Sequence, residues 1–311
     1  MSAPLCLGQR HCPVCGESPE RGTLFYKRSV DPAKLTGFSY ASRKTPEFMC
    51  YQLVKCGKCK VIFAADSIDI QQMQQAYDES LFDSAAEAEC AANSYVQALT
   101  PHLARLSDRR AVLEIGAGTG IFLDKIGTFG FKQLLGIEPS RSAINAASET
   151  IRPHLRNGIF HGEDFPDESF SLICCFMTME HVSDPLVLVR QCHRLLIPGG
   201  MMALVTHDYR AIINRILGRR SPIVDIEHLQ LFHPQSLQYL LSSSCFSDIR
   251  IQRFVNTYRV AYWLRLLPAP RWLRASVIAP LSNTKLGECR LAVNVGNLMA
   301  IAQKKGILRS T

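Results

Sequence analysis

A glycine-rich turn between residues 111 and 122 constrains the fold of this chain more than any other feature. The run AVLEIGAGTGIF begins as an apolar strand that ends beside Glu114. Three glycines then follow at alternate positions, Gly116, Gly118 and Gly120. Glycine adopts dihedral angles that are strained in other residues, and it lets the backbone approach a ligand with no Cβ in the way. The run therefore predicts a cofactor site at the carboxyl edge of a parallel sheet.

The spacing of the glycines separates two classes of cofactor. The dinucleotide fingerprint G-x-G-x-x-G/A requires a small residue at position 121, where this chain has Ile121. The observed G-x-G-x-G after Glu114 instead resembles motif I of the class I S-adenosylmethionine-dependent methyltransferases.

The segments after this turn follow in the order that the resemblance requires. A second apolar strand, residues 134–137, ends in Glu138, where Rossmann-like folds place a ribose-binding carboxylate. Residues 159–164 are expected to form the third strand and an acidic loop, which in the family lies beside the adenine. Residues 170–177 are apolar except for Ser171, as in a central parallel strand that is covered on both faces. Residues 201–206 supply the fifth strand.

The resemblance covers about residues 110–210 and implies an α/β fold with a Rossmann-like sheet that binds S-adenosylmethionine. The residues that it implies as cofactor ligands are Glu114, Gly116, Gly118, Gly120, Glu138, Glu163 and Asp164. Glu138 is the expected ribose ligand, although alone it would indicate only a solvated carboxylate at a strand end. Glu114 suits a cationic cofactor, whether it faces that ligand or caps the turn.

Composition agrees with a globular enzyme. Of the 311 residues, 47% are hydrophobic and 20% are charged, which excludes a disordered chain. No apolar run approaches the roughly 18 residues of a membrane span, and the start of the chain has no signal-peptide pattern, so we expect a cytoplasmic protein. The net charge of +8 tolerates an anionic partner but is spread along the chain.

Two C-x2-C pairs near the start of the chain indicate a zinc site. They consist of four of the twelve cysteines, Cys12, Cys15, Cys56 and Cys59. In a cytosolic protein such pairs are typical of metal ligands rather than disulfides. Four thiolates leave zinc no open position, so the ion would be structural. Two unrelated reduced pairs are the alternative, and Cys6, Cys50 and His11 remain as substitute ligands.

The sequence divides into three parts. We expect a zinc-binding module over residues 1–65, with a small hairpin module between the cysteine pairs, and then a helical connector over 66–108. The methyltransferase domain follows over 109–311, with an insert at about 256–292. This order resembles a bacterial branch of class I methyltransferases from sugar, surface-glycan and natural-product pathways. In that branch the connector tends to cover the cofactor, which makes Tyr77 either a lid residue or a buried core tyrosine.

Three histidines are candidates for catalysis: His181, His207 and His228. The family fold places the acceptor over the carboxyl ends of strands four and five, which His181 and His207 follow. His228 could deprotonate an acceptor hydroxyl, because imidazole titrates close to working pH, or it could anchor its loop. Methyl transfer needs a base only when the nucleophile must lose a proton, and much of its rate comes from proximity and orientation.

Residues 258–274 form an aromatic and basic stretch. The sequence leaves three interpretations open: an amphipathic insert packed on the domain, a lid over a hydrophobic acceptor, or a segment that contacts a membrane surface. Pro268 and Pro270 argue against one long interfacial helix.

These observations favour a methyltransferase that acts on an oxygen or carbon of a small or carrier-linked acceptor. One alternative is an RNA methyltransferase with a zinc module, but the exit of strand four is not the N/D-P-P-Y/F turn of base-amine methylation. The chain also has no concentrated basic stripe with interleaved aromatic residues, so nucleic acid is an unfavoured partner. A second alternative is a non-catalytic scaffold, against which the intact glycine turn argues. The acceptor, the methylated atom and the oligomeric state are not indicated.

Overall fold

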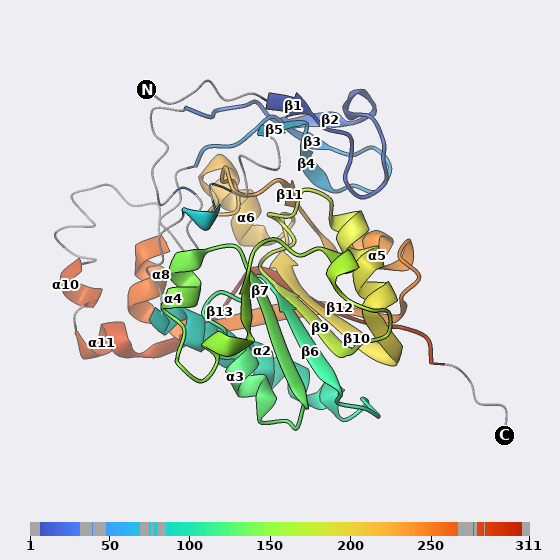
Figure 1. Cartoon of the computed structure of the whole chain (residues 1–311). Coiled ribbons are helices and arrows are strands. Elements are labelled where there is room, and N and C mark those ends of the chain that lie inside the picture. The colour runs from blue at the N-terminus through green and yellow to red at the C-terminus, as the bar shows by residue number, and fades with distance from the viewer. Residues whose placement is uncertain are drawn as a thin grey trace.

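A seven-stranded sheet forms the centre of the computed structural model, which describes residues 7–31, 39, 48–68, 75, 77–79, 85–266, 276, 279–282 and 284–306. Its strands are β6 (Ala111–Ile115), β7 (Gln133–Glu138), β8 (Leu155–Asn157), β9 (Phe170–Phe176), β10 (Leu196–His207), β12 (Ser247–Arg259) and β13 (Arg290–Gln303). They lie in the order β12-β13-β10-β9-β6-β7-β8 (Figure 1). β13 is antiparallel to both neighbours, and the other pairs are parallel. The predicted Rossmann-like α/β sheet is confirmed.

Both faces of this sheet are buried, which explains why its central strands are mostly apolar. Leu113 and Ile173 pack into the layer that contains α5 (Pro185–Leu195) and α7 (Pro234–Ser242). The alternate residues of the same strands pack into the layer of α2 (Ala85–Leu103) and α3 (Ile121–Gly127). Each buried aliphatic side chain stabilises the fold by about 1.5–3 kcal/mol. No helix within the described residues is long and apolar enough to cross a membrane.

The N-terminal cysteine region, shown in blue in Figure 1, contributes most of a second, four-stranded sheet. Three strands come from that region and the fourth from far along the chain: β2 (Thr23–Tyr26), β3 (Leu53–Lys55), β4 (Ile62–Ala64) and β11 (Gln230–Leu231). β11 pairs antiparallel with β4. Phe63 packs toward the main sheet, while Ile62 packs against the segment that leads into β11. The N-terminal region and the later chain therefore share one sheet.

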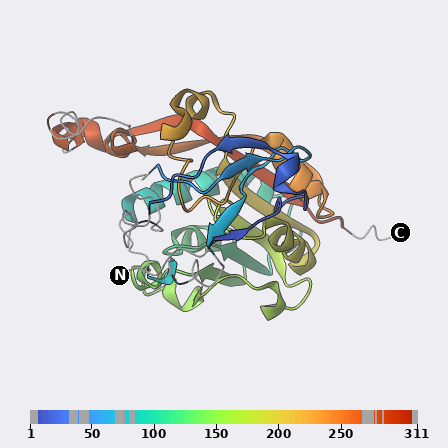
Figure 2. The same ribbon diagram turned by 90° about the horizontal axis from the view of Figure 1, so that it is seen from above.

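β12 and β13 continue beyond the other strands as a two-stranded arm (Figure 2). Between them lie α8 (Val260–Leu266), α10 (Ala279–Ser282) and α11 (Lys285–Glu288). β12 extends to Arg259 and β13 begins at Arg290, so the ends of the expected insert at about 256–292 are paired strand residues. Residues 267–275, including Pro268 and Pro270, lie outside the described part of the chain.

Two expected elements differ in the structure. The third strand is β8, which precedes residues 159–164, and Gly162–Asp164 form a 3-10 helix, η4. β7 ends at Glu138, opposite Asn157, so residues beyond 157 have no strand to pair with. The first three residues of the expected helical connector instead form β5 (Asp66–Ile68), which pairs with β1 (Leu7–Gln9). Of the hairpin expected between the cysteine pairs, residues 32–38 and 40–47 lie outside the described residues, while β2 pairs with β3.

Candidate active site

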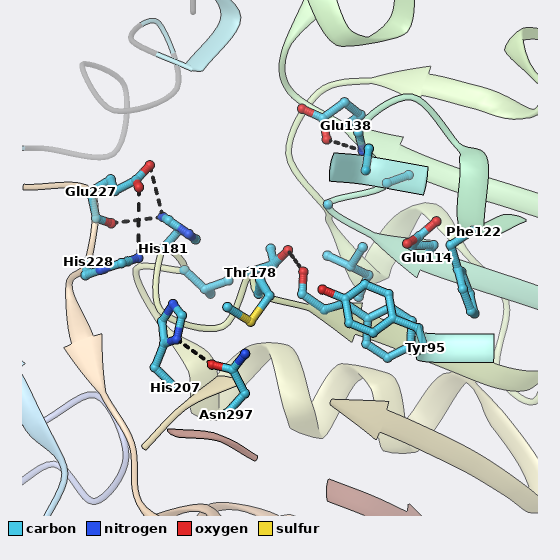
Figure 3. Close-up of a pocket in the computed structure, with 18 of the residues that line it drawn as sticks. Tyr95, Glu114, Phe122, Glu138, Thr178, His181, His207, Glu227, His228 and Asn297 are labelled. Carbon is cyan, nitrogen blue, oxygen red and sulfur yellow. Dashed lines mark hydrogen bonds and ion pairs between the residues drawn. The ribbon is translucent and has the colours of Figure 1, made fainter. Parts of the chain in front are cut away.

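One cavity of about 840 Å³ opens at the carboxyl ends of the parallel strands. The glycine turn, the end of β7, the loop after β9, residues 222–228 and the arm all contribute to its lining. Figure 3 shows Glu114 and Glu138 on one side and the histidines on the other. The cavity therefore joins the expected cofactor residues to the expected catalytic residues.

The glycine turn has the geometry of a ligand cradle. Gly116, Gly118 and Gly120 have φ angles of +78°, +55° and +72°, which favour glycine. A Cβ on Gly116 would lie 2.2 Å from Thr178 Oγ1, so that glycine is required by packing. A Cβ on Gly118 would meet nothing within 4 Å, and Gly118 lines the cavity. Gly120 is not among the lining residues and begins α3, so its role is structural.

Glu138 is held in place by the backbone of the turn. Its Oε2 accepts from Gly118 N at 2.7 Å, and its Oε1 accepts from Ser140 N at 2.8 Å. Burial raises the pKa of Glu138, while the two backbone hydrogen bonds act in the opposite direction. The carboxylate lines the cavity and has further acceptor capacity there, which suits the hydroxyls of a ribose.

The other expected acidic cofactor ligands divide into two groups. Glu114 is buried and lines the cavity. Glu163 and Asp164 are exposed on η4 and are not among its lining residues, and Glu163 instead accepts from Gln191 Nε2 at 2.9 Å. The backbone leaves the sheet at Gly158, so the residues that reach the cavity are 158–161 and the acidic pair lies beyond it.

His181 and His228 meet at the opposite end of the cavity, together with Glu227 (Figure 3). The His228 Nδ1 lies 2.9 Å from the carbonyl oxygen of Ile223 and donates to it. This contact leaves Nε2 as the basic nitrogen of the neutral ring, 3.9 Å from Glu227 Oε1. His228 thus has the arrangement of a general base with a carboxylate beside it.

Tyr77 and His207 complete this group of polar residues. The Tyr77 hydroxyl lies 3.0 Å from His181 Nδ1, and Tyr77 lines the cavity. His207 Nδ1 lies 2.9 Å from Asn297 Oδ1, and its ring centroid is 5.5 Å from that of His228. The structure therefore brings together all three candidate histidines. The sequence analysis did not assign roles to Glu227 and Asn297; the position of Glu227 next to His228 was the only signal for it.

The His181, Glu227 and His228 side chains also have a donor set that a metal ion can use. One ligand atom from each lies within 4.8 Å of the others. Two imidazoles and a carboxylate suit several divalent ions.

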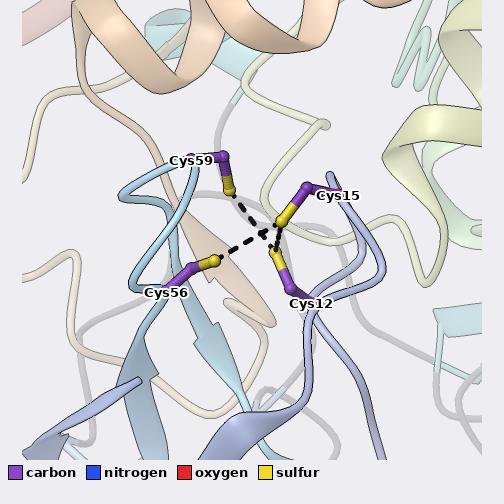
Figure 4. A group of neighbouring side chains, drawn as sticks. All are labelled: Cys12, Cys15, Cys56 and Cys59. Carbon is purple, nitrogen blue, oxygen red and sulfur yellow. Dashed lines mark hydrogen bonds between the residues drawn. The ribbon is translucent and has the colours of Figure 1, made fainter. Parts of the chain in front are cut away.

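The four N-terminal cysteines converge on a single point (Figure 4). The Cys12 and Cys59 sulfurs are 3.4 Å apart, and Cys15 Sγ is 3.5 Å from both Cys12 Sγ and Cys56 Sγ. None of them forms a disulfide. Four sulfurs at these separations fit the tetrahedral coordination of zinc. Cys50 lies outside this cluster, beside Ser29, and Cys6 lies outside the described residues.

The first prediction concerns the metal content of this cluster. We expect purified protein to contain one zinc per chain. Cys56→Ser should lose this zinc and unfold the N-terminal sheet, because zinc binding contributes on the order of 10 kcal/mol to the folding free energy. Elemental analysis and circular dichroism would measure both effects. Cys50→Ser, a buried cysteine of the same region, should keep its zinc. Zinc-free wild-type protein that remains folded would refute the prediction.

Arg10 connects the cysteine region to the loops that carry the histidines. Its guanidinium donates to Ser183 O at 2.7 Å, and also to Leu229 O at 3.4 Å and Ala64 O at 3.2 Å. Burial lowers the pKa of Arg10 to about 10, so the side chain remains charged at neutral pH. Ser183 follows His181 and Leu229 follows His228, so one side chain joins both loops to β4.

The second prediction is that Arg10→Ala lowers kcat roughly 10- to 100-fold, because small displacements of catalytic groups have effects of this size. The affinity for S-adenosylhomocysteine should not change, since Arg10 is not among the cavity-lining residues. Arg28→Ala removes an exposed partner of Asp66 in the same region and serves as the control. Equal kcat in the Arg10 and Arg28 variants would show that this contact does not position the loops.

Three comparisons relate this chain to known proteins. A family model described as a methyltransferase domain matches residues 82–247. A ubiquinone biosynthesis O-methyltransferase of Coxiella burnetii is 25% identical over 138 residues, which cover 40% of this chain and 58% of that protein. The one from Bradyrhizobium diazoefficiens is 32% identical over 99 residues, which cover 30% and 39%. The chain thus matches less than two thirds of the length of either relative.

Solved structures also resemble this chain. A methyltransferase from Thermotoga maritima, described as a possible histamine N-methyltransferase, is 22% identical, with a TM-score of 0.46. The alignment covers 70% of this chain and 91% of that one.

Proposed function

We propose that this chain methylates an oxygen or a carbon of a small or carrier-linked acceptor. The chain belongs to the methyltransferase domain family and is an S-adenosylmethionine-dependent methyltransferase. S-adenosylmethionine supplies an electrophilic methyl group when bound. Glu114, Gly116, Gly118 and Glu138 would hold it, because these residues line the cavity beside the glycine turn. The acceptor class includes sugars, glycans and natural-product intermediates.

The observation that carries the proposal is the shared cavity. The cradle around Gly118 and the pair formed by His228 and Glu227 line the same space. His228 Nε2 would take the proton from the attacking hydroxyl, and the Glu227 carboxylate would stabilise the imidazolium that forms. His181, beside Tyr77 and Glu227, would orient this pair.

The names of the two curated relatives support oxygen as the methylated atom. Both curated relatives described above are O-methyltransferases, and a base beside the acceptor is needed for a hydroxyl. Methylation of carbon would use the same base to remove a proton from an acidic C–H bond.

Native mass spectrometry of purified protein tests the cofactor, and transfer of a labelled methyl group to a panel of hydroxylated acceptors tests the reaction. We expect an S-adenosylmethionine or S-adenosylhomocysteine adduct and label on at least one acceptor. No adduct after added cofactor and no transfer would favour the scaffold alternative. Label on RNA, with salt-dependent binding, would instead favour the nucleic-acid alternative.

Elemental analysis of the same sample separates the two uses of the histidine group. One zinc per chain is expected for the cysteine cluster alone. A second bound divalent ion that Glu227→Gln removes would make these side chains metal ligands and would exclude His228 as a free base.

A further inference from the structure

We infer that the part of the cavity lined by the arm is a subsite for a hydroxyl-bearing ring without anionic groups, in which Asn256 determines specificity by accepting a hydrogen bond from the ring. This inference rests on the proposed function, because it assigns the substrate class of the same site. Three independent features carry it: an unsatisfied amide oxygen on the arm, a group of aromatic side chains on the arm and the charge of the cavity lining.

Asn256 lies on β12 and is 3% exposed, yet it lines the cavity. Its Oδ1 has no hydrogen-bond partner among the described residues. The register of β12 against β13 shifts between Phe254 and Asn256, and bulges of this kind redirect a side chain next to active sites. A buried acceptor without a partner is unfavourable in the empty protein, so a hydroxyl that donates to Oδ1 removes that penalty on binding.

Aromatic side chains stand next to Asn256. Tyr258, Tyr262 and Trp263 line the cavity, and their ring centroids are 4.5–5.6 Å apart. Trp263 Nε1 donates to Leu291 O at 2.9 Å, which fixes the indole against β13. Three rings held in this way offer an apolar surface to the face of a ring-shaped ligand, while the amide accepts from its edge.

The charges of the cavity exclude anionic groups. Among the described residues, no lysine or arginine lines it, whereas Asp184, Asp225 and Glu227 do. An acceptor phosphate or carboxylate placed beside Asp225 and Glu227 would lose its hydration and meet carboxylates, with no lysine or arginine among the described lining residues to compensate. The subsite therefore selects a ring by hydroxyls and apolar faces and rejects the charged counterpart of the same ring.

The test uses the full chain saturated with S-adenosylhomocysteine and two matched pairs of probes. Catechol is compared with 3,4-dihydroxybenzoate, and methyl glucoside with methyl glucoside 6-phosphate, by ligand-observed NMR and calorimetry. We expect at least one neutral ring to bind and its anionic counterpart to bind at least tenfold more weakly. Equal or stronger binding of the anionic members, or no binding of either neutral ring, overturns the inference.

Asn256→Leu identifies the residue responsible. We expect it to weaken the neutral ring about tenfold, as for one lost hydrogen bond, and to leave the affinity for S-adenosylhomocysteine unchanged. The same variant should raise the melting temperature of the ligand-free protein, because it replaces a buried unpaired oxygen. Asn145→Leu, at an exposed amide on α4 (Arg141–Asn145), is the control.

Wild-type affinity for the neutral ring in folded Asn256→Leu would refute the role of Asn256. Failure of the wild type to bind S-adenosylhomocysteine would be a failure of the proposed function itself. The two failures are therefore measured by different ligands.

Discussion

Gly118→Val should weaken binding of S-adenosylhomocysteine on the order of 100-fold, because a side chain overpacked into a filled site costs about 2–3 kcal/mol and each 1.4 kcal/mol is tenfold. Gly118 lines the cavity, and its added Cβ would meet no protein atom within 4 Å. The new side chain therefore has room in the protein and occupies the space proposed for the cofactor. Isothermal titration calorimetry measures this loss directly.

A valine at position 118 could lower the affinity by blocking the site or by straining the backbone, because Gly118 has a φ of +55°. The control must separate these two causes. Gly130→Val is matched to it: Gly130 has a φ of +86°, and its Cβ would also meet nothing within 4 Å, but Gly130 is not among the cavity-lining residues. Both variants should lose similar stability, and only Gly118→Val should lose the ligand. Unchanged affinity in folded Gly118→Val would mean that the cofactor binds elsewhere.

His228→Gln should lower kcat by about 10²–10⁴, the usual contribution of a general base, once the acceptor screen has supplied a substrate. Glutamine retains a donor toward the Ile223 carbonyl, so the loop keeps its contact while the basic nitrogen is lost. Binding of S-adenosylhomocysteine should be unaffected. Steady-state kinetics and calorimetry on the same samples would separate the two effects.

The pH profile gives a readout that a structural role would not change. A base must be unprotonated, so the wild-type rate should fall as the pH decreases and His228 becomes charged, and His228→Gln should lose this acid limb. His154→Gln, at an exposed histidine beside Leu134 O, should keep both kcat and the limb. A full wild-type rate and profile in His228→Gln would identify His228 as a loop anchor.

Local patterns predicted the main sheet because each strand carries its own signal. The β9 run is apolar since both of its faces are covered, and the glycines after β6 must adopt positive φ. The prediction of the third strand at residues 159–164 was wrong because β8 is a three-residue edge strand. Its position depends on where β7 ends and not on its own composition.

The candidate site was predicted in part for a similar reason. His181 and His207 follow parallel strands, which all end at one edge of the sheet, so their approach followed from topology. Glu163 and Asp164 were expected at the cofactor, but the chain leaves the sheet before them and exposes both. Asn256 gave no signal in the sequence, because its proposed role depends on a register shift between β12 and β13.

The sequence by itself indicated the Rossmann-like sheet, the glycine cradle and the four-cysteine cluster, since each is marked by short motifs of residues close together in the chain. Only the tertiary structure decided that β11 completes the cysteine-bearing sheet and that Arg10 ties the His181 and His228 loops to it. These contacts join residues more than 150 positions apart. Such long-range contacts form where surfaces fit together and where backbone groups still need hydrogen-bond partners in the assembled fold. No local sequence pattern encodes either condition.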